Sequence, residues 1–510
     1  MEISPQLVMK GKTGYNMIQI NSPNHEYEYD LHSLVKAFFP KEEITFIKDG
    51  EEPKDQMNLV SLMIDEKNHC AQLILSFFNA HSDSRDTKEM RSYTMDESYV
   101  NQIAGFKNQV KLFFYDSMVD FLKRELPWGN LTGIRPTKIA LSYLEAGKSE
   151  EEICEILERE HRVGDEKKKL GIEIAKRERN ILSPLDYENG YSLYIGIPFC
   201  PTTCLYCSFT SNPIGKWQKR IDEYLDCLQR ELEYCAEEFK DKKCNTIYIG
   251  GGTPTALSKQ HLERLLKTVT EIFSFEHLYE FTVESGRPDS ITEEKLLVMK
   301  KYNVSRISVN PQTMNEETLK YIGRQHSVKE TIDTFHLARN CGFDNINMDI
   351  ILGLPQEKPE HVRKTLDEIS KLRPDSLTVH SLAIKRASKM RSFVEENGME
   401  IFGDPEEMMQ IASEGARSLG MVPYYLYRQK NMAGNLENVG YAKEGKYGIY
   451  NILIMEEVQN IVACGAGVVS KRVYQDGRIE RCDNVKDVAL YIDKIDEMIE
   501  RKKALFRDWK

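Results

Sequence analysis

The sequence has no long hydrophobic run. No stretch approaches the ~18 consecutive apolar residues of a membrane-spanning helix. The N-terminus, Met1-Glu-Ile-Ser-Pro-Gln6, has no basic segment followed by an apolar core, so we expect no signal peptide. Internal repeats and low-complexity tracts are also missing. These absences favour a globular protein of the cytoplasm without a membrane span.

Positive charge is in short supply. The chain carries 69 Lys and Arg against 80 Asp and Glu, which gives a formal net charge of −11. Proteins that wrap nucleic acid usually show a basic footprint. We therefore expect no nucleic-acid partner, although a net value does not exclude a local basic patch.

Paired cysteines are not expected either. The count of eleven is odd, and a long chain of this class rarely depends on a disulfide framework. Three of the eleven, Cys200, Cys204 and Cys207, fall within eight residues. This concentration is the most unusual feature of the sequence.

The length of 510 residues suggests about three domains of about 150 residues each. Residues 1–165 read as an N-terminal α/β accessory domain, with strands at 58–64 and 71–77 and an amphipathic helix at 110–126. A second helix begins at Ser149, where Glu152 completes a capping box. Residues 166–187 form a charged helical linker.

Residues 188–395 alternate between β-rich runs and amphipathic helical stretches, which predicts parallel βα units. The runs lie at 193–197, 246–249, 279–283, 305–309, 346–352 and 376–381. Six units are too few for a closed eight-stranded barrel, so we predict a partial (β/α)6 barrel of the TIM type. Functional residues of such barrels lie at the C-terminal ends of the strands. Residues 396–510 are predicted to be a helix-rich α+β domain that covers the substrate.

The cysteine spacing C-x3-C-x2-C has three interpretations. Three buried structural thiols are one, since free cysteine is often buried. Structural zinc is another, but it takes four ligands and no fourth Cys or His lies nearby in the sequence. A cubane iron–sulfur cluster normally takes four thiolates. With three, one iron stays open for an exogenous ligand, and this interpretation accounts best for the missing fourth cysteine.

This motif, placed directly after a first strand and with the aromatic Tyr206 before its last cysteine, resembles the signature of the radical S-adenosylmethionine (SAM) superfamily. The resemblance implies that Cys200, Cys204 and Cys207 hold a [4Fe-4S] cluster whose open iron binds SAM. An electron from the cluster would cleave SAM into methionine and a 5′-deoxyadenosyl radical that abstracts hydrogen. The cofactor supplies this chemistry, and the protein supplies placement.

Further segments resemble the oxygen-independent coproporphyrinogen III oxidase family, in its longer branch with an extra N-terminal domain. They are Tyr194, Cys207-Ser-Phe209, the turn Gly250-Gly-Gly-Thr-Pro-Thr255, Glu284, Pro311-Gln312, Arg324, the run Asn347-Met-Asp-Ile-Ile-Leu-Gly-Leu-Pro355, Ala383, and the segments 427–438 and 465–467. The resemblance implies two SAM molecules. Tyr194, Gly251, Glu284 and Arg324 would serve the first; Tyr206, Gly252, Thr253, Gln312, Asp349 and Ala383 the second, with Val469 closing it. Tyr194 and the three cysteines form the expected catalytic set.

Two segments depart from that family. It often has Gly-Val-Gln where this chain has Asn310-Pro-Gln312. It also often has Glu-x-Asn-Pro where this chain has Glu284-Ser-Gly-Arg-Pro288. The departures concern the substrate-facing details more than the radical chemistry.

The substrate implied by the resemblance is coproporphyrinogen III, which carries four propionates. Two would lose CO₂ and become vinyl groups, giving protoporphyrinogen IX. Cations would hold propionates by charge-assisted hydrogen bonds, and the candidates are Lys385, Arg386, Lys389, Arg391, Arg428, Lys430, Lys471 and Arg472. A merely solvated basic face is the alternative.

Other functions stay open. One is a different radical SAM enzyme of tetrapyrroles, such as a haem-opening methyltransferase. A second is a haem chaperone, although the His-Asn-x-x-Tyr-Trp motif usual in that relative is missing and the last histidine is His380. An RNA-modifying enzyme is disfavoured by the charge. We expect a monomer that receives electrons from a donor of the flavodoxin or ferredoxin type.

Overall fold

The computed structural model describes residues 17–22, 25–40, 42–48, 51–52, 58–65, 70–79, 84–94, 103–133, 135–384, 388–397, 403–429 and 436–509. The chain divides into two compact units, the first comprising 1–172 with 428–436 and the second 173–427 with 437–510. Among the described helices, none is both long enough and apolar enough to cross a membrane.

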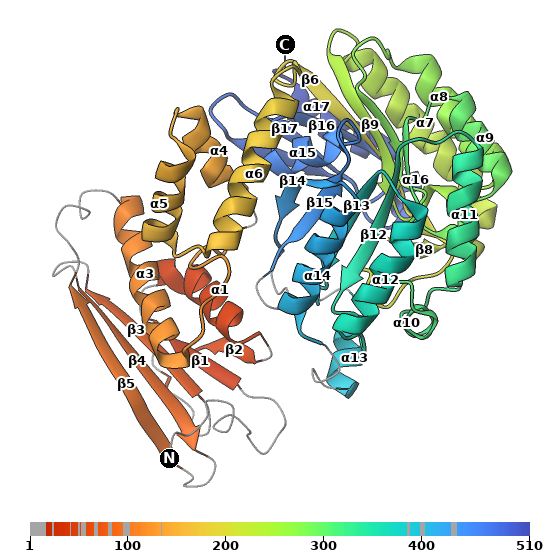
Figure 1. Ribbon diagram of the computed structural model, residues 1–510. Helices are drawn as coiled ribbons and strands as arrows, with labels where there is room; N and C mark the ends of the chain where they lie inside the picture. Colours follow the sequence, from red (N-terminus) through yellow and green to blue (C-terminus); the bar gives the residue numbers. More distant parts are fainter. Residues whose placement is uncertain are drawn as a thin grey trace. The chain divides into compact units, whose positions relative to one another are not determined.

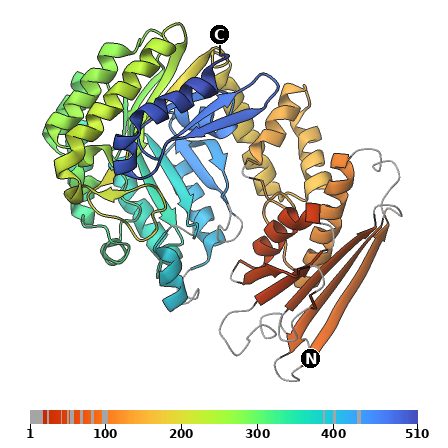
Figure 2. The same cartoon turned by 180° about the vertical axis from the view of Figure 1, so that it is seen from behind.

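The first unit is a five-stranded sheet covered on one face by two helices (Figures 1 and 2). The strand order is β2-β1-β3-β4-β5. Strand β1 pairs in parallel with β2 and β3, and β3, β4 and β5 are antiparallel. Ile18, Leu34, Leu62 and Phe114 are fully buried between the two layers. The elements are β1 (Met17–Asn21), η2 (His25–Tyr27), α1 (Glu28–Phe38), β2 (Glu43–Phe46), β3 (Asn58–Asp65), β4 (Cys70–Asn79), β5 (Ser84–Thr94) and α3 (Ile103–Leu122).

Two short helices complete this unit, α4 (Thr137–Glu145) and α5 (Glu150–His161). The predicted capping box is confirmed. The Ser149 hydroxyl accepts from the Glu152 N–H at 3.2 Å, and the Glu152 carboxylate accepts from the Ser149 N–H at 2.8 Å. The predicted strands and the long helix of this region are present as well. The helix α6 (Asp165–Leu182) leads from the first unit into the second.

The second unit contains the six predicted parallel strands, side by side in chain order. They are β6 (Gly190–Ile197), β9 (Lys243–Gly251), β10 (Glu280–Val283), β11 (Arg306–Ser308), β12 (Ile346–Leu352) and β13 (Ser376–Ser381). Outer helices follow the strands (Figure 1): α7 (Ile221–Glu238), α8 (Lys259–Ile272), α9 (Glu293–Lys301), α10 (Glu316–Tyr321), α11 (Val328–Asn340) and α12 (Pro359–Leu372). The predicted α/β fold is confirmed, and the first and last strands, β6 and β13, do not pair with each other.

The amphipathic pattern of the outer helices explains their packing. Helix α8 buries Leu262, Leu265, Leu266 and Val269, which share one side of the helix because they are spaced three to four residues apart. The strands are buried almost throughout, as expected for parallel strands covered by helices. Residues that stay accessible in these strands therefore stand out.

The C-terminal part of the chain extends the same sheet at both edges. Strands β14 (Val422–Tyr427) and β15 (Asn438–Ala442) continue antiparallel from β13. Strand β16 (Asn460–Cys464) pairs in parallel with β6 and leads to β17 (Val469–Val473) and β18 (Ile479–Asp483). The remaining helices are α13 (Met390–Asn397), α14 (Pro405–Ser418), α15 (Ile449–Glu456), α16 (Val488–Asp493) and α17 (Ile495–Phe506). The domain boundaries drawn from the sequence stay a prediction.

A buried ion pair joins the last helix to the barrel. The ammonium of Lys502 on α17 contacts the carboxylate of Glu231 on α7, and the two side chains are 1% and 0% exposed. The same carboxylate accepts from the Tyr491 hydroxyl at 2.6 Å and from the Gly465 N–H at 2.7 Å. Glu231 thus holds both the C-terminal helices and the turn after β16.

Candidate active site

The three clustered cysteines lie on one loop at the C-terminal end of β6. The two-residue strands β7 (Phe199–Cys200) and β8 (Asn212–Pro213) pair with each other and close the base of the loop. The Leu205 N–H donates to the Ile322 carbonyl at 3.0 Å and fixes the middle of the loop beside the end of α10. We call residues 200–213 the cysteine loop. Its two anchors bring Cys200, Cys204 and Cys207 into one neighbourhood.

All three thiols are free, and two are buried. Cys200 is 8% and Cys204 is 7% exposed, whereas Cys207 is half-buried. Burial raises the pKa of Cys200 to about 11, and the negative charges that Cys207 and Cys204 would carry add to the rise. Burial also raises the pKa of Cys207. Three neighbouring thiolates therefore need a positively charged centre to become stable together.

A single metal ion and an iron–sulfur cluster make different demands on the geometry of this loop. In the part of the chain that the structure describes, no three His, Cys, Asp or Glu side chains meet closely enough to hold one metal ion. A cubane cluster makes a different demand, because each of its thiolates binds a different iron and the sulfurs need not converge on one point. The set of donors, three cysteines without an acid or histidine among them, suits iron–sulfur ligation.

A glycine turn packs directly against the start of the cysteine loop. It follows β9, and the Gly252 N–H donates to the Ile197 carbonyl at 2.7 Å. A Cβ atom on Gly252 would lie 3.0 Å from the Cys200 sulfur and 2.5 Å from the Phe199 carbonyl oxygen. Gly251 has φ +101°, a conformation that side chains disfavour. Only glycine fits this closely packed turn, and both Gly251 and Gly252 keep some accessible surface.

Five inward-facing side chains keep accessible surface. Tyr194, Tyr248, Asp349 and His380 each sit in a strand whose neighbouring residues are buried, and Glu284 directly follows β10. Their alternation with buried neighbours places them on the barrel's inner side. This level of the barrel is where a bound molecule would find polar groups.

The acids at this level differ in their ionisation. Glu284 retains some accessible surface, yet protein atoms surround it; this burial and the nearby charge of Asp349 raise its pKa to about 8. Burial also acts on Asp349, but His380, Asn347 and Thr378 outweigh it and lower the pKa of this carboxyl. The His380 Nε2 lies 3.8 Å from Asp349 Oδ2. One carboxyl is therefore kept ionised, and the other is mostly protonated at neutral pH.

The segment after β11 carries backbone strain. Gln312 has φ +66°, in the left-handed region that costs non-glycine residues energy. Its side-chain Oε1 is buried and has no hydrogen-bond partner among the described residues, and the same holds for Asn310 Oδ1. Strain together with unsatisfied polar atoms is typical of ligand-binding positions. Gln312 is thus a candidate binding residue.

Arg324 joins this segment to the cysteine loop. Its Nη1 donates to the Asn310 carbonyl at 2.6 Å, and its Nη2 donates to the Tyr206 hydroxyl at 2.9 Å. Its buried Nε has no partner among the described residues. The structure therefore brings together Tyr206, Arg324 and the Gln312 segment, which were identified from separate motifs of the sequence. Thr253 also belongs here, since its hydroxyl donates to the Cys200 sulfur at 3.5 Å, and Ala383 lies two residues beyond β13.

Comparison with known proteins gives this arrangement a family. The Radical SAM superfamily model matches residues 194–369. The oxygen-independent coproporphyrinogen-III oxidase-like protein HemZ of Bacillus subtilis is 39% identical over 92% of this chain and 94% of its own length. The chain belongs to the HemZ family.

Two other relatives are similar over shorter parts. The haem chaperone HemW of Bacillus subtilis is 30% identical over 60% of this chain and 76% of its own length. The oxygen-independent coproporphyrinogen III oxidase of Escherichia coli is 33% identical over 38% of this chain and 42% of its own length. The HemZ family is thus related both to an oxidase and to a chaperone, and its place among radical SAM proteins implies a [4Fe-4S] cluster and SAM.

In this HemZ family member, one residue near the cysteines was not singled out from the sequence. Arg287 is 3% exposed, and its Nη1 lies 3.7 Å from the Cys204 sulfur. It belongs to the segment Glu284-Ser-Gly-Arg-Pro288, which departs from the pattern of the coproporphyrinogen oxidases. That departure was the available signal, but it did not reveal that the chain bends back toward the cysteine loop.

The basic residues proposed for substrate carboxylates have mixed positions in this HemZ family member. Lys385, Arg386 and Lys430 lie outside the described residues. The Arg428 guanidinium, in the first unit, donates to the Leu131 carbonyl at 2.5 Å. Lys471 pairs with Glu457 at 2.9 Å, and Arg472 lies over the rings of Tyr474 and Trp509. Their convergence on a substrate stays a prediction.

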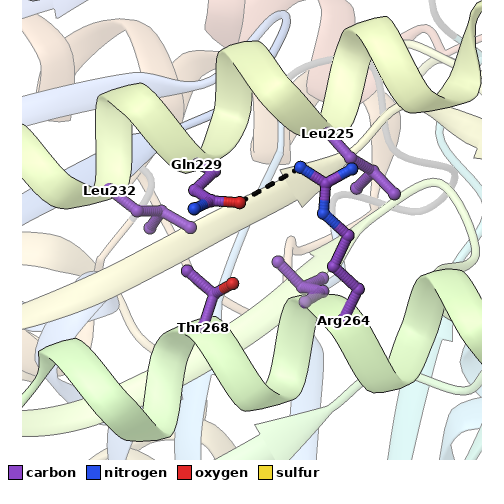
Figure 3. A pocket seen from close by; sticks show the side chains of 6 residues that line it. Leu225, Gln229, Leu232, Arg264 and Thr268 are labelled. Atoms are coloured by element: carbon purple, nitrogen blue, oxygen red, sulfur yellow. Dashed lines mark hydrogen bonds between the residues drawn. The ribbon is translucent and has the colours of Figure 1, made fainter.

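A small pocket lies elsewhere, between α7 and α8 (Figure 3). It has room for about one water molecule. Its lining consists of Leu225, Gln229, Leu232, Arg264, Leu265 and Thr268. None of them belongs to the strand ends or the cysteine loop, so this pocket is not the candidate site.

Proposed function

We propose that this HemZ family member oxidatively decarboxylates two propionates of coproporphyrinogen III and yields protoporphyrinogen IX in anaerobic porphyrin biosynthesis. The observation that carries the proposal is the cysteine loop after β6 together with accessible polar side chains on neighbouring strands of the same barrel. Similarity to the oxidase and to HemZ supports the choice of substrate.

The residues of the loop fit a cluster. Cys200, Cys204 and Cys207 would hold it, and Gly252 lets the backbone of the glycine turn lie close to Cys200. When bound, the cluster and SAM supply a carbon-centred radical that can take a hydrogen atom from a propionate. The substrate then releases CO₂ and one electron to an acceptor, which leaves a vinyl group. The protein itself orients the substrate and keeps water away.

We place the first SAM among Tyr194, Gly251, Glu284 and Arg324, and a second among Tyr206, Gly252, Thr253, Gln312, Asp349 and Ala383. The unsatisfied Oε1 of Gln312 and the ionised Asp349 support polar contacts of this kind. A protonated Glu284 is a suitable neighbour for a group that brings positive charge, since binding would favour loss of its proton. A ratio of one SAM per chain in fully active protein would contradict the second site.

Haem transfer is the rival function, because HemW is also a relative. The sequence lacks the His-Asn-x-x-Tyr-Trp motif usual in the chaperone, and its last histidine is His380. That histidine lies on β13, beside Asp349 and Tyr427. We therefore favour the enzyme. We also propose that the protein acts in the cytoplasm as a monomer. Its electrons would come from a donor of the flavodoxin or ferredoxin type.

Product analysis separates the two functions. Anaerobically reconstituted protein with SAM, a reductant and coproporphyrinogen III should release CO₂ and form protoporphyrinogen IX, detected by chromatography after oxidation to the porphyrin. Tight haem binding without any decarboxylation would favour the chaperone. A methylated or ring-opened product would instead indicate another tetrapyrrole enzyme.

A further inference from the structure

Arg287 makes direct contact with one of the cluster cysteines. It lies just before η6 (Pro288–Ser290), and its Nη1 is 3.7 Å from the Cys204 sulfur. The same Nη1 donates to the Thr202 hydroxyl at 2.8 Å. A guanidinium is always protonated in proteins. A permanent positive charge therefore lies beside a sulfur atom of the cysteine loop.

Asp289 fixes the direction of this guanidinium. Its two carboxylate oxygens accept from Arg287 Nε at 2.9 Å and from Nη2 at 2.6 Å. This bidentate pair leaves Nη1 as the part that faces the loop. His326, with Nδ1 3.9 Å from the same carboxylate, is neutral at pH 7, because burial and Arg324 lower its pKa to about 4. The Asp289 carboxylate is therefore the main charge that offsets Arg287.

We propose that Arg287, oriented by Asp289, raises the reduction potential of the cluster through its contact with Cys204. This inference rests on the proposed function only in that a cluster occupies the cysteine loop. Reduction adds one electron from an external donor and makes no new bond. Hydrogen bonds to ligand sulfurs and local charge set the potentials of such clusters. A cationic donor stabilises the more negative, reduced state, so Arg287 makes the cluster easier to reduce.

The pair gives the proposal a signature of opposite signs. Arg287→Met removes the cation and the donor, so the midpoint potential should fall. Asp289→Asn removes the offsetting negative charge while the guanidinium stays, so the potential should rise. A purely structural role would not move the potential in opposite directions. The measurement is an anaerobic redox titration without SAM, followed by the electron paramagnetic resonance signal of the reduced cluster.

Two further variants separate the hydrogen bond from the charge and protect the test against misfolding. Arg287→Met combined with Asp289→Asn removes both charges at once, so no unpaired buried charge remains. Its potential should stay below that of the unmodified protein, because the donor to sulfur is lost. Arg287→Lys keeps the positive charge but not the bidentate fork. Its midpoint potential should lie between that of the double variant and that of the unmodified protein.

Arg264 provides a matched control. It also pairs with an aspartate, Asp226, at 2.5 Å, and Figure 3 shows its side chain in the pocket between α7 and α8, hydrogen-bonded to Gln229. Arg264→Met removes the same charge from the outer helices. Its potential should equal that of the unmodified protein.

The outcomes discriminate sharply. The proposal would be supported by a lower midpoint potential in Arg287→Met, a higher one in Asp289→Asn and an unchanged one in Arg264→Met. Equal potentials in all variants, or a shift of the same sign in the two single variants, would overturn it. Loss of the cluster from every Arg287 variant, while apo-protein melting is unchanged, would also overturn it and make Arg287 a cluster-binding residue. If the unmodified protein holds no iron, the proposed function fails instead.

Discussion

At the scale of single residues, the site contains side chains whose charge or hydrogen-bonding capacity is not satisfied by the protein itself. Three thiols share one loop, and burial raises the pKa of two of them, Cys200 and Cys207. Gln312 combines a strained backbone with a side-chain oxygen that has no hydrogen-bond partner among the described residues. Neither feature stabilises the apo-protein. Both become favourable when a ligand with complementary charge is bound, which is why we assign them to binding.

The cysteines should be individually required for the cluster. The reconstituted protein should hold about four iron atoms per chain. Most of this iron should be lost in each of the variants Cys200→Ala, Cys204→Ala and Cys207→Ala. Cys227→Ala, Cys235→Ala and Cys464→Ala are matched controls, since these cysteines are buried in the second unit but lie outside the loop. Iron analysis and electron paramagnetic resonance provide the measurement. A triple Ala variant of the loop that still holds the cluster would refute the assignment.

Gln312 should show a split between stability and binding. Gln312→Gly relieves the left-handed strain, so it should be more stable than Gln312→Ala by about 1 kcal/mol, while both lose the amide and bind SAM more weakly. Gln356 has the same φ of +66° but is exposed. Gln356→Gly should therefore leave SAM affinity unchanged. Equilibrium dialysis with labelled SAM and thermal melting test this, and unchanged affinity in both Gln312 variants would exclude the residue from the site.

At the scale of elements, buried polar pairs connect helices to the barrel. Glu178 on α6 is fully buried, and neither of its carboxylate oxygens has a hydrogen-bond partner among the described residues. Burial and the charge of Glu456 on α15 raise its pKa well above the ordinary value. Lys502 and Glu231, in contrast, form a satisfied pair between α17 and α7. Removal of one charge should therefore act in opposite directions at these two places.

Glu178→Met should stabilise the protein at high pH. Folding raises the pKa of Glu178, so the folded protein holds a proton that the unfolded chain releases. Any stability that this carboxyl contributes is fully present below its unfolded pKa, and it is lost as the pH rises through its folded pKa. The gain should be on the order of 1–3 kcal/mol at pH 8 and should shrink toward pH 5. Urea unfolding at the two pH values measures it, with exposed Glu188→Met as the control. A larger gain at pH 5 than at pH 8 would contradict the raised pKa.

Lys502→Met should destabilise the second unit by about 3–5 kcal/mol, because it leaves the Glu231 carboxylate buried without its cation. The neighbouring Lys503 is exposed and pairs with Glu500 on the surface. Lys503→Met should change stability by less than about 0.5 kcal/mol. Urea unfolding provides the comparison. Equal effects of the two substitutions would show that the buried pair does not hold α17.

The sequence predicts local patterns well and distant contacts poorly. The six parallel strands and the capping box at Ser149 follow from periodicity and spacing within short windows. Strands β14 to β18 were not placed, because they depend on the edges of β13 and β6, far away in the sequence. The contact of Arg287 with Cys204 depends on how the chain turns after β10, which no local pattern reveals.

At the scale of the whole molecule, the chain combines one extended sheet, which carries the candidate site, with a separate α/β unit of unassigned role. The HemZ relative matches 94% of its own length, so both units belong to the family. The accessible polar side chains, the cysteine loop and the strained Gln312 segment all lie in the sheet-bearing unit. We propose that this unit removes a hydrogen atom from a propionate of a tetrapyrrole.

The most direct test follows that hydrogen. Coproporphyrinogen III carrying deuterium on the propionate carbon next to the ring is incubated anaerobically with the reconstituted protein, SAM and a reductant. We expect mass spectrometry to show that 5′-deoxyadenosine gains one deuterium, and we expect CO₂ and a vinyl product to form in step with it. Deuterium-free 5′-deoxyadenosine with no CO₂ release, from protein whose cluster is intact and reducible, would contradict the proposed activity.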